Sequence, residues 1–173
     1  MFGLFSRARE NLERENFASH MVGVSIFTAN LVLADIAKDC PEFSTMFESD
    51  FDEWTRIWST IFTLSLFTSM RQKLSPQDHE KLFIAFCKAS EKAPRLGSIG
   101  NEYRNDLFRY VRRHDRPLKE SLGAWVIEKS ARRLDYTGKG EPLYSLLGQS
   151  ILIRLEPYLS VVTSSSGVSG QDE

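Results

Sequence analysis

The sequence has few of the residues that cross-link small proteins. Its 173 residues include two cysteines, Cys40 and Cys87, and three histidines. None of them has the spacing of a zinc site or of a catalytic metal motif, so we expect no metal and no cofactor. Two cysteines behind an N-terminus that does not resemble a secretory leader are typical of reduced thiols. The sequence therefore predicts a cytoplasmic protein that folds without disulfides.

An excess of charge of either sign is also missing. The chain has 22 basic and 23 acidic residues, which gives a formal net charge of −1. Such a balance provides no bulk attraction to nucleic acid or to anionic lipid. Binding to either would have to come from a local cluster of basic residues.

Apolar residues, in contrast, are plentiful: 42% of the chain is hydrophobic, with twelve Phe and three Trp. This supports one domain with a sizeable core. The longest apolar run, residues 16–38, is apolar nearly all round a helical wheel and polar only in a narrow seam that includes His20 and Asn30. Such a helix is either buried or spans a membrane. The polar residues within the run, Asp35 among them, favour the buried helix of a soluble bundle.

Five further segments have apolar residues at helical spacing, and each is bounded by proline, glycine or a capping residue. The clearest boundary is Ser75-Pro76-Gln77-Asp78, which has the pattern of a capping box. The stretch IFTLSLFT also alternates with a period of two, as strands do, but the helical pattern continues on both sides. We expect helices over about 51–73, from Pro76, after Ser98, after Pro117 and over 142–156, the last ended or kinked by Pro157. The predicted fold is all-α, a single-domain bundle of about six helices around a central apolar helix.

Three regions are expected along the chain: a lead-in over residues 1–15, the helical bundle over 16–159 and a disordered tail over 160–173. The tail is rich in Ser and Gly and too poor in apolar residues to fold alone. In the lead-in, Phe2, Leu4 and Phe5 stand beside Arg7 and Arg9. These apolar residues either pack on the bundle or make a weak contact with a membrane surface.

The densest charge cluster lies at residues 104–119. Arginine binds phosphate and carboxylate groups through two parallel hydrogen bonds, so the cluster is a candidate site for a phosphorylated ligand, nucleic acid or an acidic partner. The alternative is a solvated helix flank, paired with neighbouring acids such as Asp106 and stabilised by the helix dipole. The candidate binding residues are Arg104, Arg109, Arg112, Arg113, His114 and Arg116.

His20 and Asn30 form a second candidate site, in a pocket between helices. They lie about three helical turns apart and cannot hold one atom together, and no nucleophile or acid is placed to complete a triad with His20. A structural, hydrogen-bonded role is the simpler interpretation. No other constellation of catalytic residues occurs, which argues against an enzyme.

The sequence thus predicts a non-catalytic helical protein, an adaptor or regulator, that binds another macromolecule or forms a homodimer. The first alternative is phosphate or nucleic-acid binding through the arginine cluster. The second is a carrier or enzyme that uses an apolar pocket between helices.

Overall fold

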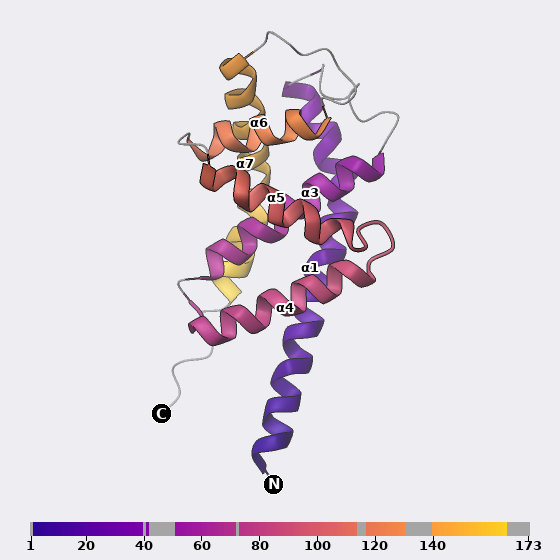
Figure 1. Cartoon of the computed structure of the whole chain (residues 1–173), viewed down its shortest axis with the longest axis vertical. Coiled ribbons are helices and arrows are strands. Elements are labelled where there is room, and N and C mark those ends of the chain that lie inside the picture. The colour runs from indigo at the N-terminus through magenta and orange to yellow at the C-terminus, as the bar shows by residue number, and fades with distance from the viewer. Residues whose placement is uncertain are drawn as a thin grey trace.

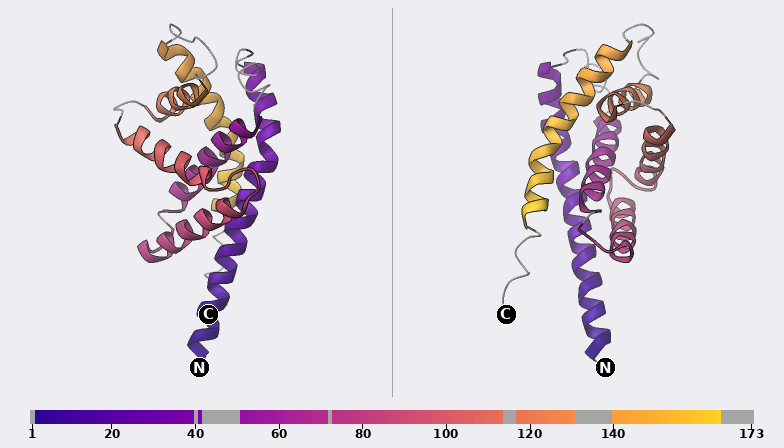
Figure 2. Two further views of the ribbon diagram at one scale, coloured as in Figure 1. Left: turned by 45° about the vertical axis from the view of Figure 1, so that its right-hand side comes forward. Right: turned by 90° about the vertical axis from the view of Figure 1, so that its left-hand side faces the viewer.

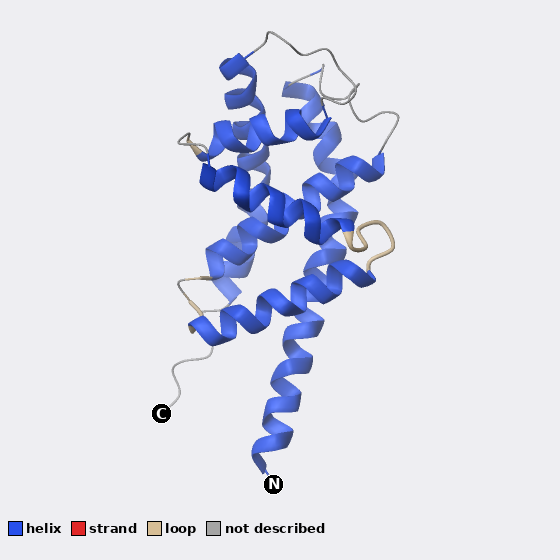
Figure 3. Cartoon of the chain, viewed as in Figure 1, coloured by secondary structure: helices blue, strands red, loops and turns tan. Residues whose placement is uncertain are grey.

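The computed structural model describes residues 2–39, 41, 51–71, 73–113, 117–130 and 140–165. These residues form helices and no strand, and the predicted all-α class is confirmed (Figures 1 and 3). The helices are α1 (Phe2–Asp39), α3 (Phe51–Met70), α4 (Pro76–Lys92), α5 (Ile99–Arg113), α6 (Leu118–Ser130) and α7 (Gly140–Ser165).

The two longest helices, α1 and α7, run side by side in opposite directions, with α3 packed against both (Figure 2). The shorter helices α4, α5 and α6 lie one after another along the bundle, where α4 packs mainly on α1, α5 on α3 and α6 on α7 (Figure 2). The N-terminal turns of α1 extend beyond the rest of the bundle (Figure 1). At 1.5 Å per residue, the 38 residues of α1 form a helix about 57 Å long. The shorter helices cover only part of this length.

Helix α1 contacts α3, α4 and α7, as expected of a central helix, but it is buried on one face only. On its outer face, Phe27 is 77% exposed and Leu31 60%. Over Arg9–Asp39 the helix is long and apolar enough to cross a membrane, and 33% of its most apolar window is buried. The predicted all-round burial therefore does not hold, because neighbouring helices lie on one side of α1. The buried face consists of Ala18, Val22, Ser25, Thr28, Ala29, Val32 and Ile36.

Buried tryptophans of α3 fix it to α1. The indole nitrogen of Trp54 donates a hydrogen bond of 2.7 Å to the carbonyl oxygen of Ala29. The indole nitrogen of Trp58 donates a hydrogen bond of 3.0 Å to the hydroxyl of Thr28. A buried indole N–H needs such a partner, so these bonds set the rotation of α1 about its axis as well as its contact with α3.

Helices α6 and α7 approach each other at two glycines. A Cβ atom on Gly123 would lie 2.0 Å from the carbonyl oxygen of Tyr144, and one on Gly148 would lie 1.5 Å from that of Lys119. Position 119 thus meets 148 and position 123 meets 144, which is the register of an antiparallel pair. Gly123 and Gly148 therefore allow the close approach of α6 and α7, whereas Gly23 in α1 meets no such neighbour.

The helix ends follow the predicted boundaries with two differences. Ser75 caps α4 and accepts a hydrogen bond of 3.1 Å from the backbone N–H of Asp78. Helix α1 begins at Phe2, so the lead-in and the apolar run are one helix. Helix α7 includes Pro157 and continues to Ser165, into the segment predicted as a tail; directly after the proline, Tyr158 packs against Phe62. Residues 166–173 lie outside the described residues.

Candidate functional site

The structure separates the predicted arginine cluster into a buried residue and an exposed group. Arg104 is 5% exposed and points between α5 and α4. Its Nη1 donates hydrogen bonds of 3.0 Å to the Sγ of Cys87 and 2.8 Å to the Oδ1 of Asn101, and its Nη2 donates one of 2.8 Å to the Oγ of Ser90. Arg104 therefore joins two helices and does not belong to an exposed binding surface.

Arg104 forms no salt bridge with any described residue, and its buried Nε has no hydrogen-bond partner. Burial accordingly lowers the pKa of Arg104 below its usual range. Burial also raises the pKa of the Cys87 thiol, and the nearby Arg104 charge compensates only in part. A raised pKa leaves less thiolate at neutral pH, which does not favour Cys87 as a nucleophile.

Arg109, Arg112 and Arg113 are exposed on the outer side of α5. Phe108 lies among them with 45% of its surface exposed, and the Arg112 guanidinium carbon is 4.1 Å from the centre of its ring. This is a cation–π contact that keeps both side chains flat on the helix. We call Phe108, Arg109, Arg112 and Arg113 the α5 surface.

The three arginines of the α5 surface form no salt bridge among the described residues. The positions three and four residues before Arg112 and Arg113 hold Phe108, Arg109 and Tyr110, none of which is acidic. Asp106, an acid that could have paired with Arg109, instead accepts hydrogen bonds from Lys129 and from the indole nitrogen of Trp125 at 3.0 Å. Among the described residues no salt bridge therefore joins Arg109 to Asp106, although the charge of Arg109 contributes to the lowered pKa of Asp106.

The pKa of Asp106 reflects this pairing. Partial burial alone would raise it, but the hydrogen bonds from Lys129 and Trp125, together with the charge of Lys129, hold the pKa below its usual range. Asp106 therefore stays ionised and directed toward α6. The other predicted members of the cluster, His114 and Arg116, lie outside the described residues, as does Asp115.

His20 and Asn30 are both exposed on the outer face of α1. Neither lines the groove along α7 described next or either of two polar cavities between α1 and α4. The predicted pocket around these two residues is therefore not found at those cavities.

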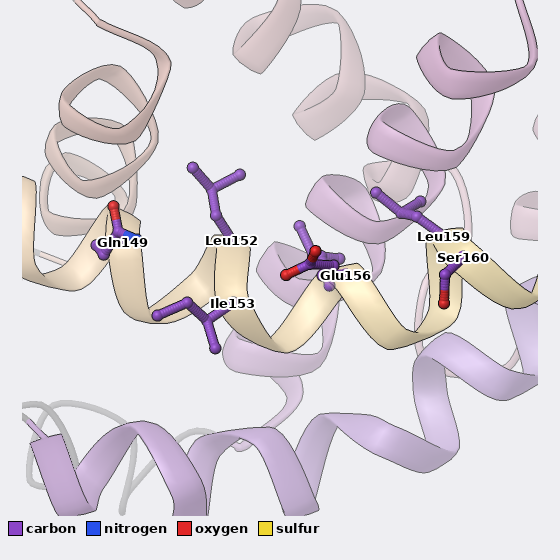
Figure 4. A pocket seen from close by; sticks show the side chains of 7 residues that line it. Gln149, Leu152, Ile153, Glu156, Leu159 and Ser160 are labelled. Carbon is purple, nitrogen blue, oxygen red and sulfur yellow. The ribbon is translucent and has the colours of Figure 1, made fainter.

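A groove of about 370 Å³ runs along α7. All its lining residues come from this one helix; Leu152 and Leu159 point to one side and Ile153 to another (Figure 4). A small-molecule site normally surrounds most of its ligand. A groove with one helix as its wall cannot do so, and it gives no support to an apolar-ligand pocket.

Sequence reasoning missed Phe108, although an aromatic residue four positions before an arginine on a helix is a recognisable signal for a stacked pair. In the part of the chain that the structure describes, no three His, Cys, Asp or Glu side chains are grouped so that they could hold a metal ion. Comparison of the chain with protein-family models, with curated proteins and with solved structures gave no match.

Proposed function

We propose that this is a non-catalytic binding protein whose α5 surface binds an acidic segment of another protein. The observation that carries the proposal is the exposed group of Arg109, Arg112 and Arg113 around Phe108, with no salt bridge to any described residue. Arginine and aromatic residues are the types most enriched in the energetic centres of protein interfaces.

The charges on α5 favour a carboxylate-bearing partner. Arg109 and Arg113 are four positions apart, so their like charges oppose each other along the helix. An acidic segment would relieve this repulsion and accept paired hydrogen bonds from each guanidinium. A nucleic-acid backbone has similar chemistry, so the test includes a nucleic-acid probe.

The proposal is tested with the double variant Arg112→Glu/Arg113→Glu and two fluorescent probes, an oligoglutamate peptide and a single-stranded oligonucleotide of equal charge. We expect the wild-type protein to bind the peptide, with an affinity that falls as salt is added. Charge reversal should abolish this binding, because each arginine is replaced by a group that repels the peptide.

The matched control is Arg71→Glu/Lys92→Glu, which changes the net charge equally at exposed positions on other segments. Peptide binding by the control should persist. Tighter binding of the oligonucleotide, lost in the α5 variant alone, would assign the surface to nucleic acid instead. Equal loss in both variants would show that overall charge, and not the α5 surface, is responsible.

A further inference from the structure

Helix α1 carries an exposed stripe with coiled-coil spacing. Along its outer face the exposed positions recur at intervals of four, three, four, three and four residues, the spacing at which two helices pack together. We call this the α1 stripe; all its members are exposed, and they are Asn16, His20, Gly23, Phe27, Asn30 and Ala34.

No contact with the described residues accounts for Gly23. A glycine inside a helix is unfavourable by about 1 kcal/mol relative to alanine, so some contact normally accounts for it. Gly123 and Gly148 each receive the backbone of a neighbouring helix, but around Gly23 no atom lies within 4 Å of where a Cβ would be. One turn away, the 77% exposed ring of Phe27 projects with nothing to cover it.

The α1 stripe is complementary to itself when reversed. If a second α1 is laid antiparallel with the symmetry axis at residue 25, Phe27 of one copy meets Gly23 of the other, twice. The large ring then fills the space left by the absent side chain. In the same register His20 meets Asn30, whose amide can hydrogen-bond an imidazole, and Asn16 meets Ala34. At the ends, Lys38 lies level with Leu12, between Glu10 and Glu13, whose carboxylates pair with Arg14 and Arg9 of their own helix.

We propose that the protein forms a two-fold symmetric dimer through antiparallel pairing of α1 about residue 25. The occupant of the stripe is a second copy of this chain, because the large and small residues and the two polar residues match each other only in that arrangement. Leu31, which is 60% exposed, flanks the stripe and extends the contact. The dimer does not depend on the α5 surface, which lies on another helix.

The contact is small. Five turns of one helix bury less than the roughly 1,600 Å² of a standard stable interface. We therefore expect a reversible dimer that dissociates on dilution in about the micromolar range. Multi-angle light scattering over a concentration series should show this. Phe27→Ala and Gly23→Leu, which remove the ring or fill the space, should each raise the dissociation constant at least tenfold.

Leu118→Ala is the matched control. It removes another exposed large apolar side chain, 54% exposed on α6, and should leave the dimer unchanged. All three positions are exposed, and circular dichroism would verify that each variant is folded.

Disulfide trapping tests the register. In a Cys40→Ser/Cys87→Ser background, the His20→Cys and Asn30→Cys variants should cross-link when mixed but not separately. In the antiparallel pair each introduced thiol is about 15 Å along the helix from its own counterpart, too far for a disulfide. Cross-linking of each variant with itself would indicate a parallel pair and overturn the proposal.

A chain that stays monomeric up to millimolar concentration would also overturn it. So would a monomer that co-sediments with phosphatidylcholine–phosphatidylserine vesicles and loses this binding in Phe27→Glu, since the occupant of the stripe would then be lipid. Neither result would bear on peptide binding by the α5 surface, so the two proposals fail separately.

Discussion

Replacing Gly148 by alanine should force α6 and α7 apart. The new methyl group would lie 1.5 Å from the carbonyl oxygen of Lys119, whereas ordinary contact requires 3.4 Å or more. The backbones must therefore separate by about 2 Å, and a backbone carbonyl cannot turn aside as a side chain can. The separation would loosen the packing of core residues on the two helices, such as the buried Leu122 and Leu147.

The expected cost follows from these distances. Overpacking a core costs about 1–3 kcal/mol or more, and the close approach here belongs at the upper end of that range. Alanine has a higher helix propensity than glycine, and this difference offsets up to about 1 kcal/mol of the cost. The free energy of unfolding should thus fall by about 2 kcal/mol or more, and the Tm by about 4–8 °C for a chain of this size.

Thermal unfolding followed by circular dichroism measures the effect. Gly23→Ala is the matched control, because it makes the same change in a helix where no atom lies within 4 Å of the new methyl group. In dilute solution, where self-association is absent, this control should raise the Tm slightly. If Gly148→Ala raised the Tm as well, the close packing of α6 on α7 would be refuted.

Three further results are expected. Arg104→Ala should lower the free energy of unfolding by about 2–3 kcal/mol, since it removes three hydrogen bonds and leaves a cavity, while Arg104→Met should cost less because its side chain fills most of that space; equal losses in urea unfolding would show that packing of this side chain does not contribute. Trp58→Phe should cost about 2–3 kcal/mol and Thr28→Val about 1 kcal/mol, since both remove the bond between the indole and the hydroxyl and only the first leaves a cavity; additive effects in the double variant would contradict coupling of the pair. The pKa of Asp39 is lowered mainly by a hydrogen bond from Ser150 and secondly by one from Arg154. The folded chain therefore binds fewer protons than the unfolded chain near pH 4. Its contribution to stability is complete well above the unfolded pKa of about 3.9 and is lost as pH falls through the lower folded value; Tm values from pH 6 to 2.5 should fall less steeply in Ser150→Ala, and an unchanged slope would exclude this residue as a cause.

The helices could be predicted from the sequence because proline, glycine and capping residues mark most of their ends. The placement of Arg104 could also have been predicted: it precedes Leu107 by three residues, and this spacing puts both side chains on the buried face of α5. The outer face of α1 could not. When a helix is apolar all round, its periodicity does not indicate which side its neighbours cover. Phe27 and Ile36 look alike in the sequence, yet one is exposed and the other fully buried.

The contact of Arg154 with the end of α1 has a consequence for folding during synthesis. Its Nη2 donates a hydrogen bond of 2.8 Å to the carbonyl oxygen of Asp35 and forms a salt bridge of 2.9 Å with Asp39. Arg154 follows Asp35 by 119 positions in the sequence. Helix α1 therefore emerges from the ribosome long before Arg154, the residue that caps it. Until α7 follows, the carbonyl oxygen of Asp35 has water as its partner, and the apolar face of α1 that the later helices cover is exposed to solvent.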